Sequence, residues 1–154
     1  MMGAEVLTMP QPMELSVEEC MQLLRGGVVG RVAMSIPAGL RILPVNYAMH
    51  GDSIVIRTTP YSELGTYGWK TALAFEVDHI DYEKHQGWSV VVSGRGALVE
   101  DDDEIDDIRA SWKPQPWASG ARNLYLRITP REITGRRLGE DWTASSTMPV
   151  RRVT

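Results

Sequence analysis

The sequence predicts a mainly β protein, a small antiparallel barrel with short α-helices, on the basis of three observations. First, about six or seven segments of strand length follow one another, joined by turns of hairpin length. Second, the helical patterns are short and flank the strand series rather than alternating with it. Third, Gly94 and Gly96 interrupt the longest strand segment, where a barrel wall must bend. Closing the sheet into a barrel would also remove its exposed edges.

Two segments carry helix signals. In the first, Ser16 and Glu19 form a capping box, in which each side chain accepts a hydrogen bond from the other residue's amide. Apolar residues then recur at helical spacing until Gly26-Gly27 ends the pattern. In the second, the four consecutive carboxylates of residues 101–104 precede a short apolar stripe, and negative charge stabilises a helix start. Residues 61–69 fit either a turn or a further short helix.

The remaining periodic segments predict strands at residues 28–35, 41–50, 53–59, 71–77, 88–100, 124–129 and 132–138. The polar stretch 78–86 is predicted to be a loop. Pro130 is expected to separate the last two strands, because it has no amide hydrogen to donate to a ladder. We expect a flexible lead-in over residues 1–13, one domain over 14–139 and a tail over 140–154.

Composition and charge narrow the class of protein. The chain has 154 residues, 43% of them apolar, which is enough for one domain with a real core. A net charge of −4 argues against broad nucleic-acid binding, which requires clustered Lys and Arg. No apolar run reaches bilayer length and no secretory signal is apparent, so we expect a cytoplasmic protein without membrane contact. The single cysteine, Cys20, excludes an intrachain disulfide and is expected to be a small buried hydrophobe.

The first candidate for anion binding is Arg57-Thr58-Thr59, at the end of a predicted strand. A guanidinium forms bidentate, charge-assisted bonds to phosphate, and the hydroxyls add neutral ones. The alternative is an exposed arginine beside two ordinary strand threonines. Pro44 places its own strand at an edge or a bulge, since it removes a ladder donor. Asn46 then offers a polar group to a groove or, alternatively, bonds to its own local backbone.

Aromatic side chains form a second candidate set. Trp88, followed by Ser89, begins the longest strand, where its indole could wall a planar ligand, pack in a dimer interface or fill the core. Trp117 and Arg122 place an aromatic ring and a cation near a loop. No metal site is predicted, because the three histidines lack metal-like pairing. Nucleophile-elbow, P-loop and dinucleotide-binding glycine patterns are absent from the sequence.

The order and spacing of seven segments carry a family resemblance: "GVVGRVAMS", "PVNYAM", "IVIRTTP", "ALAFEVDHID", "GWSVVVSGRGALV", "QPWASGARNLYLRITP" and "ITGRRL". Over residues 15–138 the chain resembles the pyridoxamine 5′-phosphate oxidase-like proteins, the flavin-binding split-barrel family. The resemblance implies a six-stranded antiparallel split barrel of the FMN-binding type. It also implies a homodimer with flavin mononucleotide (FMN) in the grooves between the subunits.

The resemblance assigns roles to the candidate residues. Residues 57–59 and the turn after them would bind the flavin phosphate, and residues 44–46 would lie along the ring system. Trp88-Ser89 would line the site from either subunit, and Trp117 and Arg122 would lie near its mouth. The expected cofactor-binding set is Pro44, Val45, Asn46, Arg57, Thr58, Thr59, Ser62, Glu63, Lys70, Trp88, Ser89, Trp117 and Arg122.

One turn departs from the family pattern, which is Gly-Ser/Thr-Lys-Leu with the lysine neutralising the phosphate. The matching residues here are Tyr61-Ser62-Glu63-Leu64, so a carboxylate replaces an ammonium group. A carboxylate within about 4 Å of a phosphate repels it by roughly 1 to 4 kcal/mol, depending on screening. Glu63 could point outward and leave the other phosphate ligands to suffice, with help from Lys70. Alternatively, the site could prefer a deazaflavin or another planar anion, or flavin binding could be lost.

Two hypotheses follow from these observations. The first is a homodimeric FMN-binding protein, a flavin-dependent oxidoreductase of unassigned substrate in which the flavin carries the redox chemistry. The second is a non-catalytic ligand-binding or interaction protein that keeps the dimeric barrel with a degenerate flavin site. No residue is assigned as a general acid, a general base or a metal ligand in either hypothesis.

Overall fold

The computed structural model describes residues 13–112 and 124–139. The predicted lead-in before Met13, the predicted tail and the candidates Trp117 and Arg122 lie outside these residues. Within the described part, seven strands and three helices follow one another in the order β1 (Met13–Glu14), α1 (Val17–Gly26), β2 (Val29–Ile36), β3 (Gly39–His50), β4 (Ser53–Thr58), α2 (Glu63–Tyr67), β5 (Ala72–Asp81), β6 (Gln86–Leu98), α3 (Asp102–Ser111) and β7 (Leu124–Leu138).

The strands form one closed antiparallel sheet. Their order is β1-β7-β4-β3-β2-β5-β6, and a further pairing of β6 with β7 joins the two sides. Six strands make up the ring, while the two-residue β1 pairs only with the outer end of β7. The predicted mainly β class and antiparallel barrel are therefore confirmed. The prediction of six strands omitted β1, which is too short to show a sequence period.

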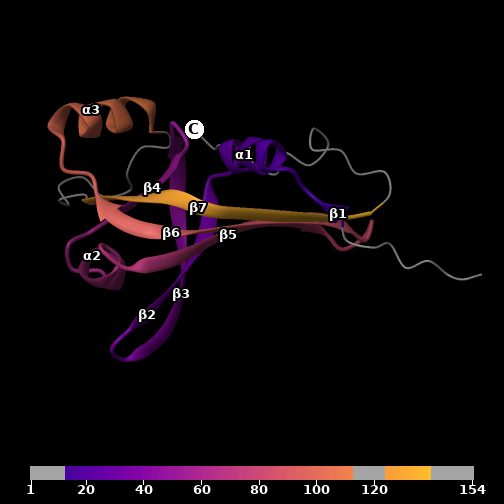
Figure 1. Cartoon of the computed structure of the whole chain (residues 1–154), viewed down its shortest axis with the longest axis horizontal. Helices are drawn as coiled ribbons and strands as arrows, with labels where there is room; N and C mark the ends of the chain where they lie inside the picture. Colours follow the sequence, from indigo (N-terminus) through magenta and orange to yellow (C-terminus); the bar gives the residue numbers. More distant parts are fainter. Residues whose placement is uncertain (1–12, 113–123, 140–154) are drawn as a thin grey trace, which may run out of the picture.

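The barrel encloses the main hydrophobic core. In β2 the side chains alternate between exposed and buried along the whole strand, as expected when one face is covered. Helix α1 contributes four buried side chains to the same core, among them Cys20 and Leu24. Its start has the predicted capping box between Ser16 and Glu19. In the view of Figure 1, α1 and α3 lie above β7 and α2 lies below it.

A second, smaller core holds α3 against the outside of the barrel. In this core, Ile108 of α3 and the C-cap residue Trp112 pack against Val55 of β4 and Tyr125 of β7. An ion pair between Arg127 of β7 and Glu104 of α3 also joins the helix to the barrel. Asp101 caps the helix by accepting hydrogen bonds from the amides of Asp103 and Glu104. The predicted acidic helix start is therefore confirmed.

Strand β7 is continuous, so the prediction of two strands separated by Pro130 is wrong. Pro130 lies opposite Gly94, and the register shifts between Ser93 and Gly94, which leaves Arg131 as an extra residue on β7. A bulge tolerates a residue without an amide hydrogen, so the ladder resumes beyond it. The irregularity lies opposite Gly94, but the extra residue is on β7 and not on β6, the strand in which the glycines predicted a bulge or bend.

The predicted loop at 78–86 is also wrong over most of its length. Residues 78–81 belong to β5 and pair across a hairpin with residues 86–89 of β6. The side chains of residues 78–81 are half-buried or exposed, so polar residues are compatible with the ladder there. Only residues 82–85 form the turn. Within the described ranges, the helices are too short or too polar for any of them to traverse a bilayer.

Tyr47 links the barrel to α1, and loss of its hydroxyl should lower the stability of the fold. Its ring packs edge-on against Phe75, and its hydroxyl donates to the Leu24 carbonyl at 2.6 Å. We expect Tyr47→Phe to lower the free energy of unfolding by about 1 kcal/mol, because a buried hydrogen bond is lost while the ring is kept. Chemical denaturation measures this change. Tyr61→Phe, at a side chain that is 96% exposed, should leave stability unchanged, and equal effects of the two variants would contradict the assignment.

Candidate functional site

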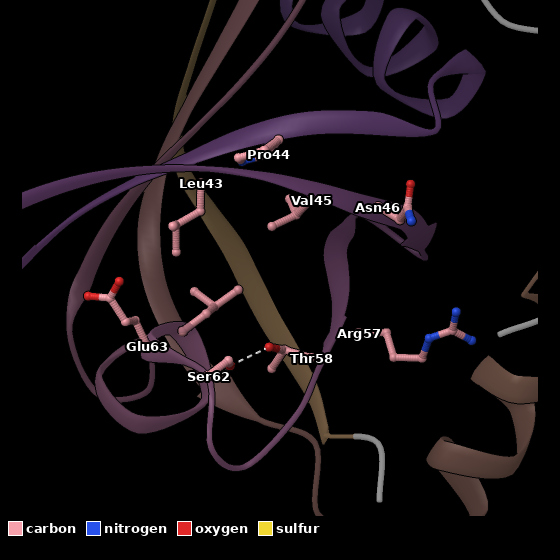
Figure 2. A pocket seen from close by; sticks show the side chains of 9 residues that line it. Leu43, Pro44, Val45, Asn46, Arg57, Thr58, Ser62 and Glu63 are labelled. Atoms are coloured by element: carbon pink, nitrogen blue, oxygen red, sulfur yellow. Dashed lines mark hydrogen bonds between the residues drawn. The ribbon is translucent and has the colours of Figure 1, made fainter. Parts of the chain in front are cut away.

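A cavity of about 370 Å³ lies where β3, β4 and α2 meet (Figure 2). It is lined by Leu43, Pro44, Val45, Asn46, Arg57, Thr58, Ser62, Glu63 and Leu64. Seven of these nine, all but the two leucines, belong to the set predicted from the sequence. The structure thus brings the strand end, the turn after it and the segment around Pro44 into one place.

The cavity forms where two strands separate. The pairing of β3 with β4 runs from His50 and Ser53 to Tyr47 and Ile56 and is not continued beyond them. Pro44 of β3 still pairs with β2 but has no β4 partner, as predicted for a residue without an amide hydrogen. The gap leaves this edge of β3 without a β4 partner next to the cavity.

Alternation along β3 divides the cavity wall into two kinds of surface. Leu43 and Val45 are half-buried and pack against the barrel core, which makes one side of the cavity apolar. Pro44 and Asn46 lie on the exposed face of the strand. The Asn46 side chain lines the cavity from β3, and Arg57 lines it from β4 (Figure 2).

The turn between β4 and α2 is organised by the Ser62 hydroxyl. Ser62 Oγ accepts a hydrogen bond from the Gly65 amide at 2.9 Å and donates to the Thr59 carbonyl at 2.9 Å. Thr58 Oγ1 lies 2.6 Å from the same oxygen (Figure 2). Because a hydroxyl carries a single proton, Thr58 must then be the donor to Ser62. Two hydroxyls therefore face the cavity as a connected pair whose protons can be redirected to an anion.

Gly65 is required by this turn. A Cβ at that position would lie 2.1 Å from the Thr59 carbonyl oxygen, which is inside any permitted contact. The absence of a side chain lets the first turn of α2 approach the end of β4 closely. The same close approach keeps Ser62 within hydrogen-bonding distance of Thr58.

Glu63, the residue that departs from the family pattern, is held by Arg41. The Arg41 Nε lies 2.9 Å from Glu63 Oε2 and 3.3 Å from Oε1, across a separation of 22 residues in the chain. Figure 2 shows the Glu63 side chain at one end of the cavity and Arg57 at the other, with Thr58 and Ser62 between them. The carboxylate is thus neutralised by a neighbouring strand and directed away from the hydroxyl pair.

Arg57 leaves the strand toward α3 rather than into the barrel. Its guanidinium carbon lies 5.4 Å from the centroid of the Trp112 ring, a cation–π distance. This contact orients the side chain, which also lines the cavity. The alternative prediction, an exposed arginine without a specific environment, does not describe this position, since Arg57 is half-buried.

The other predicted residues lie elsewhere. Thr59 contributes its carbonyl to the turn, and its side chain does not line the cavity. Lys70 lies beyond α2, with its Nζ 4.6 Å from the centroid of the Trp69 ring. Trp88 is 2% exposed and belongs to the main core, and with Ser89 it borders a separate cavity at the far end of the β5–β6 hairpin.

Two residues of the site were missed. Arg41 carries a charge opposite to Glu63, but sequence separation hid their contact. Trp112 was not proposed as a site residue, because it falls within the short apolar stripe predicted after residues 101–104. A signal for Arg41 was present, because it precedes Leu43 by two residues and so shares its face of β3.

Comparison with known proteins agrees with the fold. The family model described as pyridoxamine 5′-phosphate oxidase matches residues 16–137. An uncharacterised protein of Mycobacterium tuberculosis is 30% identical over 133 residues, covering 83% of this chain and 86% of the relative.

Two solved structures are similar over nearly their whole length. The FAD-binding protein of Mycobacterium smegmatis superposes with a TM-score of 0.74 at 30% identity, covering 83% of this chain and 99% of the other. A Corynebacterium glutamicum protein provisionally named pyridoxamine 5′-phosphate oxidase gives a TM-score of 0.71 at 29% identity, covering 84% and 100%. With the closed antiparallel sheet and the family match over residues 16–137, these similarities lead to one conclusion: the chain belongs to the pyridoxamine 5′-phosphate oxidase family.

Proposed function

We propose that this protein binds a flavin nucleotide, such as FMN, by its phosphate in the cavity between β3, β4 and α2. The observation that carries the proposal is the donor set: one guanidinium and two linked hydroxyls beside an apolar wall. Arginine and hydroxyl groups are the usual side-chain ligands of a phosphate ester. The Mycobacterium smegmatis relative is an FAD-binding protein, which supports the same ligand class here.

The size of the cavity suits part of a flavin nucleotide and not the whole molecule. Ligand pockets range from about 300 to 1,000 Å³, so a cavity of about 370 Å³ is at the small end. In this proposal it would hold the phosphate and the polyol chain of a flavin. The ring system would then lie outside it, along Pro44 and Asn46 on the exposed face of β3.

We further propose that a second copy of the chain covers that exposed face. The outer face of the β2–β3 hairpin carries three exposed apolar side chains, Leu40, Ile42 and Val29, at 82%, 70% and 54% exposure. Ile42 lies opposite Ala33 and Leu40 opposite Ser35, so small neighbours leave both side chains projecting. This apolar strip leads directly to Pro44 and the cavity, where a second subunit would exclude water from the flavin.

In such a dimer the chain's own residues would bind and orient the cofactor. Arg57 and the hydroxyls of Thr58 and Ser62 would hold the phosphate, with Ser62 exchanging the Thr59 carbonyl for a phosphate oxygen. A bound flavin supplies hydride- and electron-transfer chemistry. The degenerate-site alternative depended on repulsion by Glu63, and the ion pair with Arg41 weakens that argument.

Loss of the guanidinium should weaken flavin phosphate binding. We expect Arg57→Gln to raise the dissociation constant of FMN by about 10- to 100-fold. This change corresponds to the free energy of one hydrogen bond to a charged group. Quenching of flavin fluorescence on titration with protein measures it. Riboflavin, which has no phosphate, should bind both proteins equally.

The matched control is Arg109→Gln. Arg109 also lies over an aromatic ring of the outer core, 6.0 Å from the Tyr125 centroid, but does not line the cavity. It should bind FMN like the unaltered protein. Equal FMN binding by Arg57→Gln would remove the proposed phosphate site, and failure of the unaltered protein to bind any flavin would refute the function.

A charge in the apolar strip should separate the subunits. Because a buried, unpaired carboxylate is costly, we expect Ile42→Glu to convert the dimer to a monomer. Native mass spectrometry and light scattering report the mass of each species. Val17→Glu places the same charge on α1, at a side chain that is 60% exposed, and should leave the dimer intact. A monomeric unaltered protein, or a dimeric Ile42→Glu, would contradict the proposed interface.

A further inference from the structure

We infer that the Arg41–Glu63 ion pair makes the phosphate site selective for a singly charged phosphodiester over a doubly charged phosphomonoester. This inference rests on the proposed flavin function and concerns the same cavity. It names the class of flavin phosphate that the site prefers, namely one whose phosphate is esterified on both sides and therefore carries a single negative charge.

The charges of the site carry the inference. Among the described residues that line the cavity, Arg57 and Glu63 alone carry a formal charge, and these two charges cancel. Arg41, which adjoins the cavity through Glu63, adds one positive charge, so the three groups sum to +1. A lysine in place of Glu63 would bring that sum to +3.

The Arg41 guanidinium is already engaged by the carboxylate. Its Nε contacts both oxygens of Glu63, and its Nη1 donates to the Leu40 carbonyl at 3.1 Å. The two side chains are 35% and 42% exposed. A phosphate at Thr58 and Ser62 would therefore experience the Arg41 cation together with the Glu63 carboxylate, and the two fields oppose each other.

Ligand charge affects two opposing free-energy terms differently. Coulomb attraction to the site grows in proportion to the ligand charge. The cost of removing an ion from water grows with the square of its charge in the Born description. A weakly positive site therefore favours the monoanion, whereas a strongly positive site can offset the greater desolvation of the dianion. A phosphomonoester carries about −1.5 to −2 charges at pH 7, because its second pKa is about 6.

The test uses three flavins that differ only at the phosphate: riboflavin, FMN and the monomethyl ester of FMN. Titrations at about pH 8 keep FMN doubly charged, two units above its second pKa of about 6. The unaltered protein should bind the methyl ester more tightly than FMN. Glu63→Lys should tighten FMN by about ten-fold more than the ester and reverse the order. Glu63→Gln, which removes the charge and keeps the shape, should give an intermediate ratio.

Riboflavin separates the possible failures. Its affinity should be the same for all three proteins, and a common change in riboflavin would indicate altered folding rather than altered charge selection. Equal changes for FMN and its ester in Glu63→Lys would overturn the inference and leave the flavin function standing. If none of the three flavins binds the unaltered protein, the proposed function itself fails.

Discussion

The site depends on the Ser62 hydroxyl. This one oxygen caps α2 through the Gly65 amide, bonds to the Thr59 carbonyl and meets the Thr58 hydroxyl, so it joins the end of a strand to the start of a helix. The closeness of the two elements requires a glycine at position 65. Since the β3–β4 ladder ends before this turn, the bonds of Ser62 keep the wall of the cavity in place while the strands diverge. A cavity with a polar wall thus borders an apolar barrel without interrupting its core.

Charge is distributed over this frame by residues that are far apart in the chain. Arg57 is fixed against Trp112, which belongs to the outer core under α3, and Glu63 is fixed against Arg41 of β3. Both contacts act on exposed or half-buried groups, so they orient side chains more than they stabilise the fold. The second core therefore contributes to the site as well as to stability. In this account the barrel supplies position, and the two arginines and one carboxylate supply selectivity.

Most of the fold and about half of the predicted site could be derived from the sequence, because both depend on local patterns. The residues between Pro44 and Glu63 are close in the chain and joined by one tight hairpin, so their convergence follows from the meander. The Arg41–Glu63 pair could not be predicted, since it requires the direction of two side chains separated by 22 residues. The continuity of β7 through Pro130 depended on a bulge whose position only the paired register reveals.

The most direct test of the central claim is a crystal structure of the protein grown with excess FMN or its methyl ester. The account predicts density for the phosphate against the hydroxyls of Thr58 and Ser62, with Arg57 within hydrogen-bonding distance and the ring system along Pro44 and Asn46. Flavin bound instead in the cavity beside Ser89, or a phosphate with no contact to Ser62, would contradict it.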